Sequence, residues 1–120
     1  MTILNDIKSQ LGPTSDDTYF DQELLIHINS VMVILYQLGV MTTPVLIDAT
    51  TEWSAITGDS TQLELVKTYM AMKVKMIFDP PTSGTLADSL NNIIRELEWR
   101  ITAAVNPVDT FMSEQEVDNG

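Results

Sequence analysis

Residues 20–38, FDQELLIHINSVMVILYQL, form the stretch of sequence that decides the fold class. Its apolar residues recur at steps of three and four, as Phe20, Leu24, Ile28, Val31, Leu35 and Leu38. This spacing matches the turn of an α-helix and puts these residues on one side of it. Further apolar residues leave only a narrow polar strip, which predicts a helix buried on more than one side. Gly39 follows as a left-handed C-terminal cap.

The flanking segments repeat the helical spacing. A short helix is predicted from Thr2, a capping residue, to Leu11, just before Gly12-Pro13. A last helix is predicted over residues 85–104, starting from Ser83 or Thr85. Its predicted buried face consists of Leu86, Leu90, Ile93, Leu97, Ile101 and Ala104.

Residues 62–78 form the third main predicted helix. Thr61 and Glu64 have the spacing of a capping box, in which each side chain satisfies a free backbone N–H. Asp79-Pro80-Pro81 ends this helix, because proline has no N–H to continue it. The chain is therefore predicted to be all-α, a small bundle of three main helices plus a short N-terminal helix.

The segment between residues 40 and 60 is predicted to be irregular. Residues 45–47, Val-Leu-Ile, follow Pro44 and could form a short strand or hairpin. Residues 50–54 read as a turn with Trp53 as its aromatic side chain, and Gly58-Asp59 is a further turn signal.

The length of 120 residues indicates a single domain, predicted over residues 1–106. With 44% apolar and 19% charged residues, the composition is that of a globular protein and argues against disorder of the whole chain. Residues 107–120 carry four acids and no base, which predicts a flexible acidic C-terminal tail. There is no cysteine, so disulfides and thiolate metal sites are excluded.

Seventeen acids against six bases give a net charge of -11. A surface of this charge repels nucleic-acid phosphates and anionic membranes. No apolar run reaches the roughly 18 residues that a membrane span requires. The charge therefore argues against nucleic acid and anionic membranes as partners, and solubility alone also accounts for it.

No residue pattern points to catalysis, a metal or a cofactor. His27 is the single histidine, and Glu23 four residues earlier makes it read as a surface residue with a neighbour on the same helix. A histidine without a second ligand or a base at suitable spacing builds neither a zinc site nor a catalytic pair. Glycine-rich phosphate-binding patterns are absent. The sequence thus predicts a protein that is not an enzyme.

Five of the six bases lie on the last two predicted helices: Lys67, Lys73, Lys75, Arg95 and Arg100. They either pair with acids of the same chain, such as Glu64 and Glu98, or form a basic patch that meets an acidic surface of a neighbouring subunit. Trp53 is either a core anchor or an interface residue, and Trp99 is expected in the core. The candidate interface residues are thus Trp53 and these five bases.

Several short motifs resemble one known family. They are Thr51-x-Trp53, Val66-Lys67-Thr68-Tyr69, Lys73, Phe78-Asp79-Pro80-Pro81 and Glu96-Leu97-Glu98-Trp99-Arg100. In this order and spacing they resemble the head-tail connector, or head-completion, proteins of long-tailed bacteriophages. The resemblance covers most of residues 51–101, whereas the N-terminal half matches in length and helix content. Val74-Lys75-Met76 stands where a more basic run is expected, and the tail does not align.

The resemblance implies a helical protein of the phage neck that forms a ring under the portal and joins the DNA-filled head to the tail. Its implied partners are the portal protein, neighbouring copies of itself, and the next neck or tail-completion protein. DNA would pass through the lumen without specific binding. The implied locations are the virion neck and, during assembly, the host cytoplasm. The family brings no catalytic residues and no cofactor.

Two other classes of function remain compatible with the sequence. An acidic DNA mimic, or another helical protein-binding inhibitor, is favoured by the net charge alone and would need its acids in paired rows. A helical nucleic-acid-binding regulator would need a basic recognition helix, and no predicted helix is strongly basic.

Overall fold

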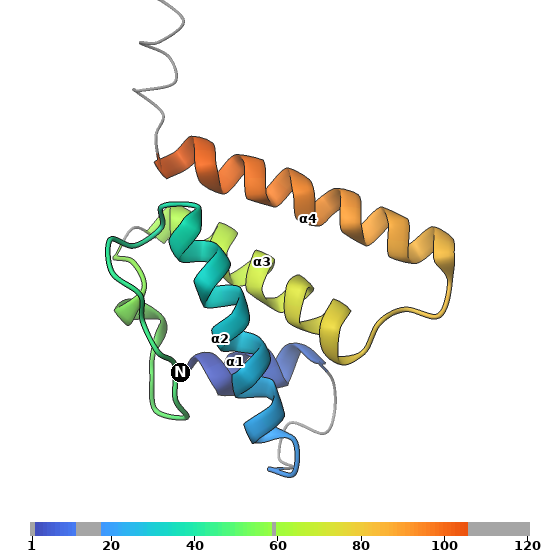
Figure 1. Cartoon of the computed structure of the whole chain (residues 1–120), viewed down its shortest axis with the longest axis horizontal. Coiled ribbons are helices and arrows are strands. Elements are labelled where there is room, and N and C mark those ends of the chain that lie inside the picture. Colours follow the sequence, from blue (N-terminus) through green and yellow to red (C-terminus); the bar gives the residue numbers. More distant parts are fainter. Residues whose placement is uncertain (1, 12–17, 59, 106–120) are drawn as a thin grey trace, which may run out of the picture.

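The computed structural model describes residues 2–11, 18–58 and 60–105, which are predominantly helical (Figure 1). The elements are α1 (Ile3–Leu11), α2 (Asp21–Gln37), the 3-10 helix η1 (Trp53–Ala55), α3 (Ser60–Phe78) and α4 (Gly84–Val105). The predicted all-α class is confirmed, and the bounds of the three main helices differ from those predicted by one or two residues. The expected strand at residues 45–47 is wrong, because these residues have no regular secondary structure.

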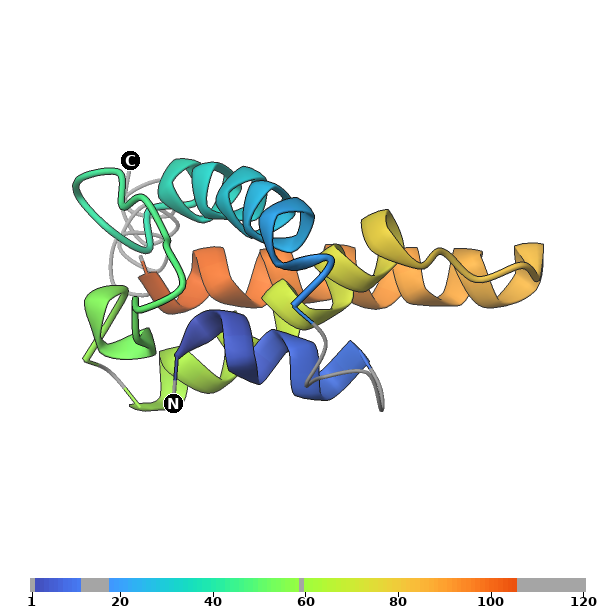
Figure 2. The ribbon, with the colours of Figure 1, turned by 90° about the horizontal axis from the view of Figure 1, so that it is seen from below.

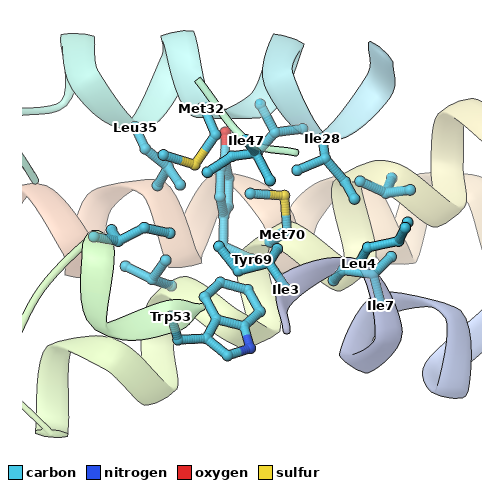
Figure 3. Close-up of a cluster of buried hydrophobic side chains, with 14 of the residues drawn as sticks. Ile3, Leu4, Ile7, Ile28, Met32, Leu35, Ile47, Trp53, Tyr69 and Met70 are labelled. Atoms are coloured by element: carbon cyan, nitrogen blue, oxygen red, sulfur yellow. The ribbon is translucent and has the colours of Figure 1, made fainter. Parts of the chain in front are cut away.

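α3 lies at the centre of the bundle and contacts each of the other three α-helices. Seen from below, α3 slants from the level of α1 to the level of α2, and α4 runs between these two levels (Figure 2). The four fully buried residues of α3 are Val66, Tyr69, Met70 and Val74. Figure 3 shows how Ile3, Leu4 and Ile7 of α1 and Ile28, Met32 and Leu35 of α2 converge on this helix. The apolar stripes predicted on these segments therefore meet in a single core.

Side-chain caps confirm two of the three predicted helix starts. The Thr2 hydroxyl accepts a hydrogen bond from the backbone N–H of Asn5 at 3.2 Å, and Ser83 does the same for Leu86 at 3.3 Å. The capping box predicted at Thr61 is wrong, because α3 already begins at Ser60 and places Thr61 inside its first turn.

Gly39 ends α2 in the predicted left-handed conformation, with a φ of 94°. Its N–H donates to the carbonyl of Tyr36 at 3.0 Å, and the N–H of Val40 donates to the carbonyl of Leu35 at 3.1 Å. A Cβ atom at this position would lie 3.1 Å from the side chain of Val105, so the end of α4 packs closely on the glycine. Both the backbone conformation and this close approach favour glycine here.

α2 is buried on one side only, so the prediction of burial on more than one side is wrong for this chain by itself. The inner face carries Leu24, Ile28, Val31, Met32 and Leu35. On the outer face Ile26 is 64% exposed and Val33 is 54% exposed. The surplus of apolar residues in this helix therefore forms a surface.

The predicted buried face of α4 is only partly correct. Leu97 and Ile101 are buried and so is Ile94, whereas Leu86 is 51% exposed and Ile93 is 43% exposed. α4 packs against α3, and its N-terminal half extends beyond the rest of the bundle in both views, so this part of the stripe has no helix to cover it (Figures 1 and 2). Ala104, also predicted on the buried face, is exposed.

Trp99 is 70% exposed, and its expected place in the core is wrong. It follows the buried Leu97 by two residues, which on an α-helix corresponds to a rotation of about 200°. The indole therefore lies on the side of α4 that faces away from α3.

Candidate protein–protein interface

The described residues contain no group of three or more His, Cys, Asp and Glu side chains placed to hold a metal ion. His27 lies beside Glu23, with 3.8 Å between Nε2 and Oε1, as the i,i+4 spacing predicts. On its other side the imidazole contacts the Phe78 ring edge to face, at 6.4 Å between centroids. None of the helices in this part of the chain is long and apolar enough to cross a membrane.

Trp53 is part of the core of the subunit, with 5% of its surface exposed. Its indole N–H donates to a carboxylate oxygen of Asp6 at 2.8 Å, which ties η1 to α1. The Lys67 ammonium lies 5.8 Å from the centroid of the indole. Two candidate interface residues thus stabilise the subunit itself, and Trp53 presents little surface to a partner.

The other four candidate bases do not form one patch. Arg100 pairs with Glu96 on the exposed side of α4, with 2.9 Å between Nη2 and Oε1. Lys73 is half-buried on α3, while Lys75 and Arg95 are exposed. Arg95 precedes Leu97 by two residues and therefore lies on the far side of α4 from α3. Lys75 instead lines the grooves between the end of α3 and the start of α4.

Glu98, one of the acids expected to pair with a cation, instead accepts a hydrogen bond from Tyr69. The phenol oxygen lies 2.6 Å from Oε2 of this carboxylate and links α3 to α4. Burial of the phenol and its hydrogen bond to the carboxylate raise the pKa of Tyr69 well above its ordinary value. The contact between α3 and α4 thus includes the protonated side chain of Tyr69.

A groove runs between the outer face of α2 and the segment that follows it. We call it the α2 groove; its lining residues are Gln22, Leu25, Ile26, Asn29, Ser30, Val33, Leu46, Ile47, Asp48 and Ala49. Its volume is about 740 Å³. Leu46, on the far wall, is 83% exposed, so the groove presents apolar side chains from both walls.

One side chain fixes the two walls of the α2 groove relative to each other. The Asn29 side chain accepts from the backbone N–H of Ile47 at 2.7 Å and donates to the Ile47 carbonyl at 3.0 Å. It also donates to the carbonyl of Leu25 in its own helix at 2.9 Å. Ile47 thereby has its backbone groups satisfied without a strand partner, which explains why the expected strand is not needed.

Asp48 is the acidic residue of the α2 groove. Its carboxylate accepts hydrogen bonds from the Thr50 hydroxyl at 2.7 Å, the Thr50 N–H at 2.8 Å and the Thr51 hydroxyl at 3.1 Å. The Thr50 hydroxyl and the other donors hold the pKa of Asp48 below its ordinary value of 3.8. The groove therefore carries a fixed negative charge at its edge.

A second apolar surface lies where α3 and α4 separate. We call it the α3–α4 end and define it by Lys75, Leu86, Leu90 and Ile93. Leu86 and Leu90 share a groove with Lys75 and the prolines of the connection. Ile93 follows Leu86 by seven residues, or two turns, and so continues the same apolar stripe along α4.

The candidate interface residues chosen from the sequence include only one member of these two surfaces, Lys75. Exposed apolar residues cannot be told from core residues by helical spacing, because both occupy the same stripe. One feature of the sequence does indicate an apolar surface on α2: this helix has more apolar residues than one buried face requires.

Uncovered apolar surfaces on an all-α protein are typical of proteins that assemble with others. A family described as "Phage connector protein" matches residues 3–108, nearly the whole chain. The chain therefore belongs to the phage connector family, a family of structural proteins of the phage neck. No protein of curated function and no solved structure matches the chain.

Proposed function

We propose that the protein forms a ring under the portal, joins the DNA-filled head to the tail, and lines the channel through which DNA passes. Membership of the connector family is the observation that carries this proposal. The uncovered α2 groove and α3–α4 end support it, because a ring subunit must offer surfaces to its neighbours. The proposed partners are the portal protein, other copies of this chain, and the next neck or tail-completion protein, met in the host cytoplasm during assembly.

The net charge of -11 suits a DNA channel that holds no phosphate tightly. Tight binding of the phosphate backbone requires clustered Lys and Arg side chains, and the exposed bases here are dispersed over α3 and α4. We propose that DNA slides past this protein without specific binding and that the protein catalyses no reaction.

The DNA-mimic alternative receives no support from the placement of three described acids. Asp6 binds the indole of Trp53, Asp21 pairs with Lys8 at 2.8 Å, and Asp48 accepts hydrogen bonds within its own turn. These three acids form hydrogen bonds or ion pairs within the subunit, and they are not arranged in rows that a DNA-binding protein could recognise.

Residues 1–106 are proposed as the connector domain and residues 107–120 as a separate acidic tail, which lies outside the described residues. A chain ending at Asn106 should keep the helix content and melting temperature of the full chain, because it retains every core residue that the structure describes. Loss of the folded state in that truncated chain would contradict this division.

Co-expression with a tagged portal protein from the same phage tests the function. The connector should be retained on the tag after nuclease treatment and co-elute with the portal as a high-mass complex. In parallel, the isolated protein should not shift a DNA fragment at low salt. DNA binding together with no retention by the portal would contradict the proposed function.

A further inference from the structure

Residues 47–53, which we call the strap, connect the α2 groove to the first turn of α1. Ile47, at the start of the strap, lies in the wall of the groove and is held to α2 by the side chain of Asn29. At the other end, the indole of Trp53 donates to the carboxylate of Asp6 on α1. Ile47 and Trp53 are 3% and 5% exposed, so each end of the strap is anchored in the core.

α1 depends on the strap for one of its backbone hydrogen bonds. The first N–H groups of an α-helix have no partner within the helix. In α1 the N–H of Ile3 donates to the carbonyl of Thr51 at 2.9 Å, and Thr2 forms an isolated antiparallel bridge with Glu52. α1 has nine residues, and isolated helices shorter than about 12–15 residues are marginal in water. Release of the strap should therefore release α1 as well.

Between its two ends the strap forms a turn that is closed by local hydrogen bonds. The Asp48 N–H donates to the Thr51 hydroxyl at 3.0 Å, and the Thr51 N–H donates to the Asp48 carbonyl at 3.3 Å. The Asp48 carboxylate adds the hydrogen bonds from Thr50 and Thr51 described above. Turns of this kind fix the backbone around an aspartate. A displacement of one end of the strap should therefore move the other end.

We propose that the strap couples α1 to the α2 groove, so that α1 and the groove wall open and close as one unit while α3 and α4 stay packed. Native proteins open locally in cooperative units of this kind. Residues 46–49 form the far wall of the groove, so release of α1 moves this wall and changes the shape of the groove. The coupling is reciprocal, because the two events share one coupling free energy. It does not depend on which partner fills the groove.

Amide hydrogen exchange of the folded full-length chain, followed by NMR, measures this coupling. Asp6→Ala removes the carboxylate that binds Trp53 and so acts at the α1 end of the strap. The amide of Ile47 reports on the groove end, because its N–H donates to Asn29. Asp6→Ala should speed exchange of the Ile47 amide and of the α1 amides by the same factor. This factor should be at least about fivefold, as expected for the loss of one hydrogen bond.

Three further variants complete the experiment. Tyr69→Phe is the matched control, because it removes one hydrogen bond between α3 and α4 and leaves the strap intact; exchange of the Ile47 amide should not change. Trp53→Phe removes the same bond as Asp6→Ala from its other side and keeps an aromatic ring in the core, so it should reproduce the effect. Asn29→Ala acts at the groove end and should speed exchange of the α1 amides.

Two results would overturn the proposed coupling. Faster exchange in α1 with an unchanged rate at Ile47 would show that the two ends of the strap open separately. Equal acceleration of the Ile47 amide by Asp6→Ala and by Tyr69→Phe would show that the strap opens only when the whole chain unfolds. Circular dichroism establishes that the variants are folded before exchange is measured.

Discussion

The side-chain amide of Asn29 hydrogen-bonds both backbone polar groups of Ile47, at 2.7 Å and 3.0 Å. An α-helix and an irregular segment eighteen residues further along the chain are thereby held at a fixed separation. The amide supplies the two hydrogen bonds that a neighbouring strand would otherwise give to the Ile47 backbone. It thereby sets the width of the apolar groove between the two segments. The residue that positions this surface is thus a half-buried polar residue, and the surface itself is apolar.

Asn29→Ala should lower the free energy of unfolding by about 1–3 kcal/mol, the range for leaving buried backbone groups without partners. Ser30→Ala is the matched control, because the Ser30 hydroxyl bonds only to the Ile26 carbonyl of its own helix at 3.1 Å. Urea unfolding followed by circular dichroism measures both. A change below about 0.5 kcal/mol for Asn29→Ala, which is usual for surface substitutions, would contradict the role given to this amide.

The bond between Tyr69 and Glu98 predicts a loss of stability at alkaline pH. The pKa of Tyr69 is raised in the folded protein, whereas in the unfolded chain the phenol ionises near its ordinary value of 10.0. Above about pH 10 the unfolded chain therefore binds fewer protons, and stability falls by up to about 1.4 kcal/mol per pH unit.

The check is the difference in unfolding free energy between the wild-type chain and Tyr69→Phe as pH changes. This difference should be constant below pH 10 and shrink above it, because phenylalanine has no proton to lose. Tyr36→Phe serves as the control, since Tyr36 is 39% exposed. A difference that does not change between pH 9 and 11 would contradict the buried, protonated state of Tyr69.

Gly39→Ala should destabilise the protein by about 1–2 kcal/mol, the usual cost of a left-handed residue with a Cβ atom. Contact with Val105 at the end of α4 adds to this cost. Gly58→Ala is the comparison, because nothing lies within 4 Å of a Cβ atom at that position. Thermal melts of the two variants measure the difference; equal melting temperatures would contradict the packing of α4 against this turn.

Replacing each of the two tryptophans with alanine should change the stability of the protein by very different amounts. Trp53→Ala removes a buried side chain and its bond to Asp6, and should cost about 3–5 kcal/mol. Trp99→Ala removes a side chain that is 70% exposed, and should change stability by less than about 0.5 kcal/mol. Urea unfolding of both variants decides this, and a large loss for Trp99→Ala would mean that α4 packs on its other side.

Helical spacing predicted the number, type and approximate bounds of the helices because each has at least one face that packs in the core. It failed where a stripe continues past the helix that covers it, as at Leu86 and Ile93. The expectation that Trp99 lies in the core was wrong for a different reason, because its spacing from Leu97 places this large apolar residue on the open side of α4. Spacing reports which residues share a face, but only the packing of the whole chain determines whether that face is covered.

The candidate site was harder to predict than the fold. The charged residues chosen as an interface are spread over the molecule, and Lys67 lies over the indole of Trp53. The α2 groove depends on the hydrogen bonds between Asn29 and Ile47, and no local sequence pattern predicts this contact. The apolar surplus of α2 is present in the sequence, but helical spacing alone predicts from it a helix buried on more than one side.

Electron-microscopic imaging of the purified complex with the portal protein tests the proposed function most directly. The expected image is a ring of connector subunits under the portal, coaxial with its channel. Connector subunits bound singly around the portal, or a complex whose density leaves the portal mouth free, would contradict it.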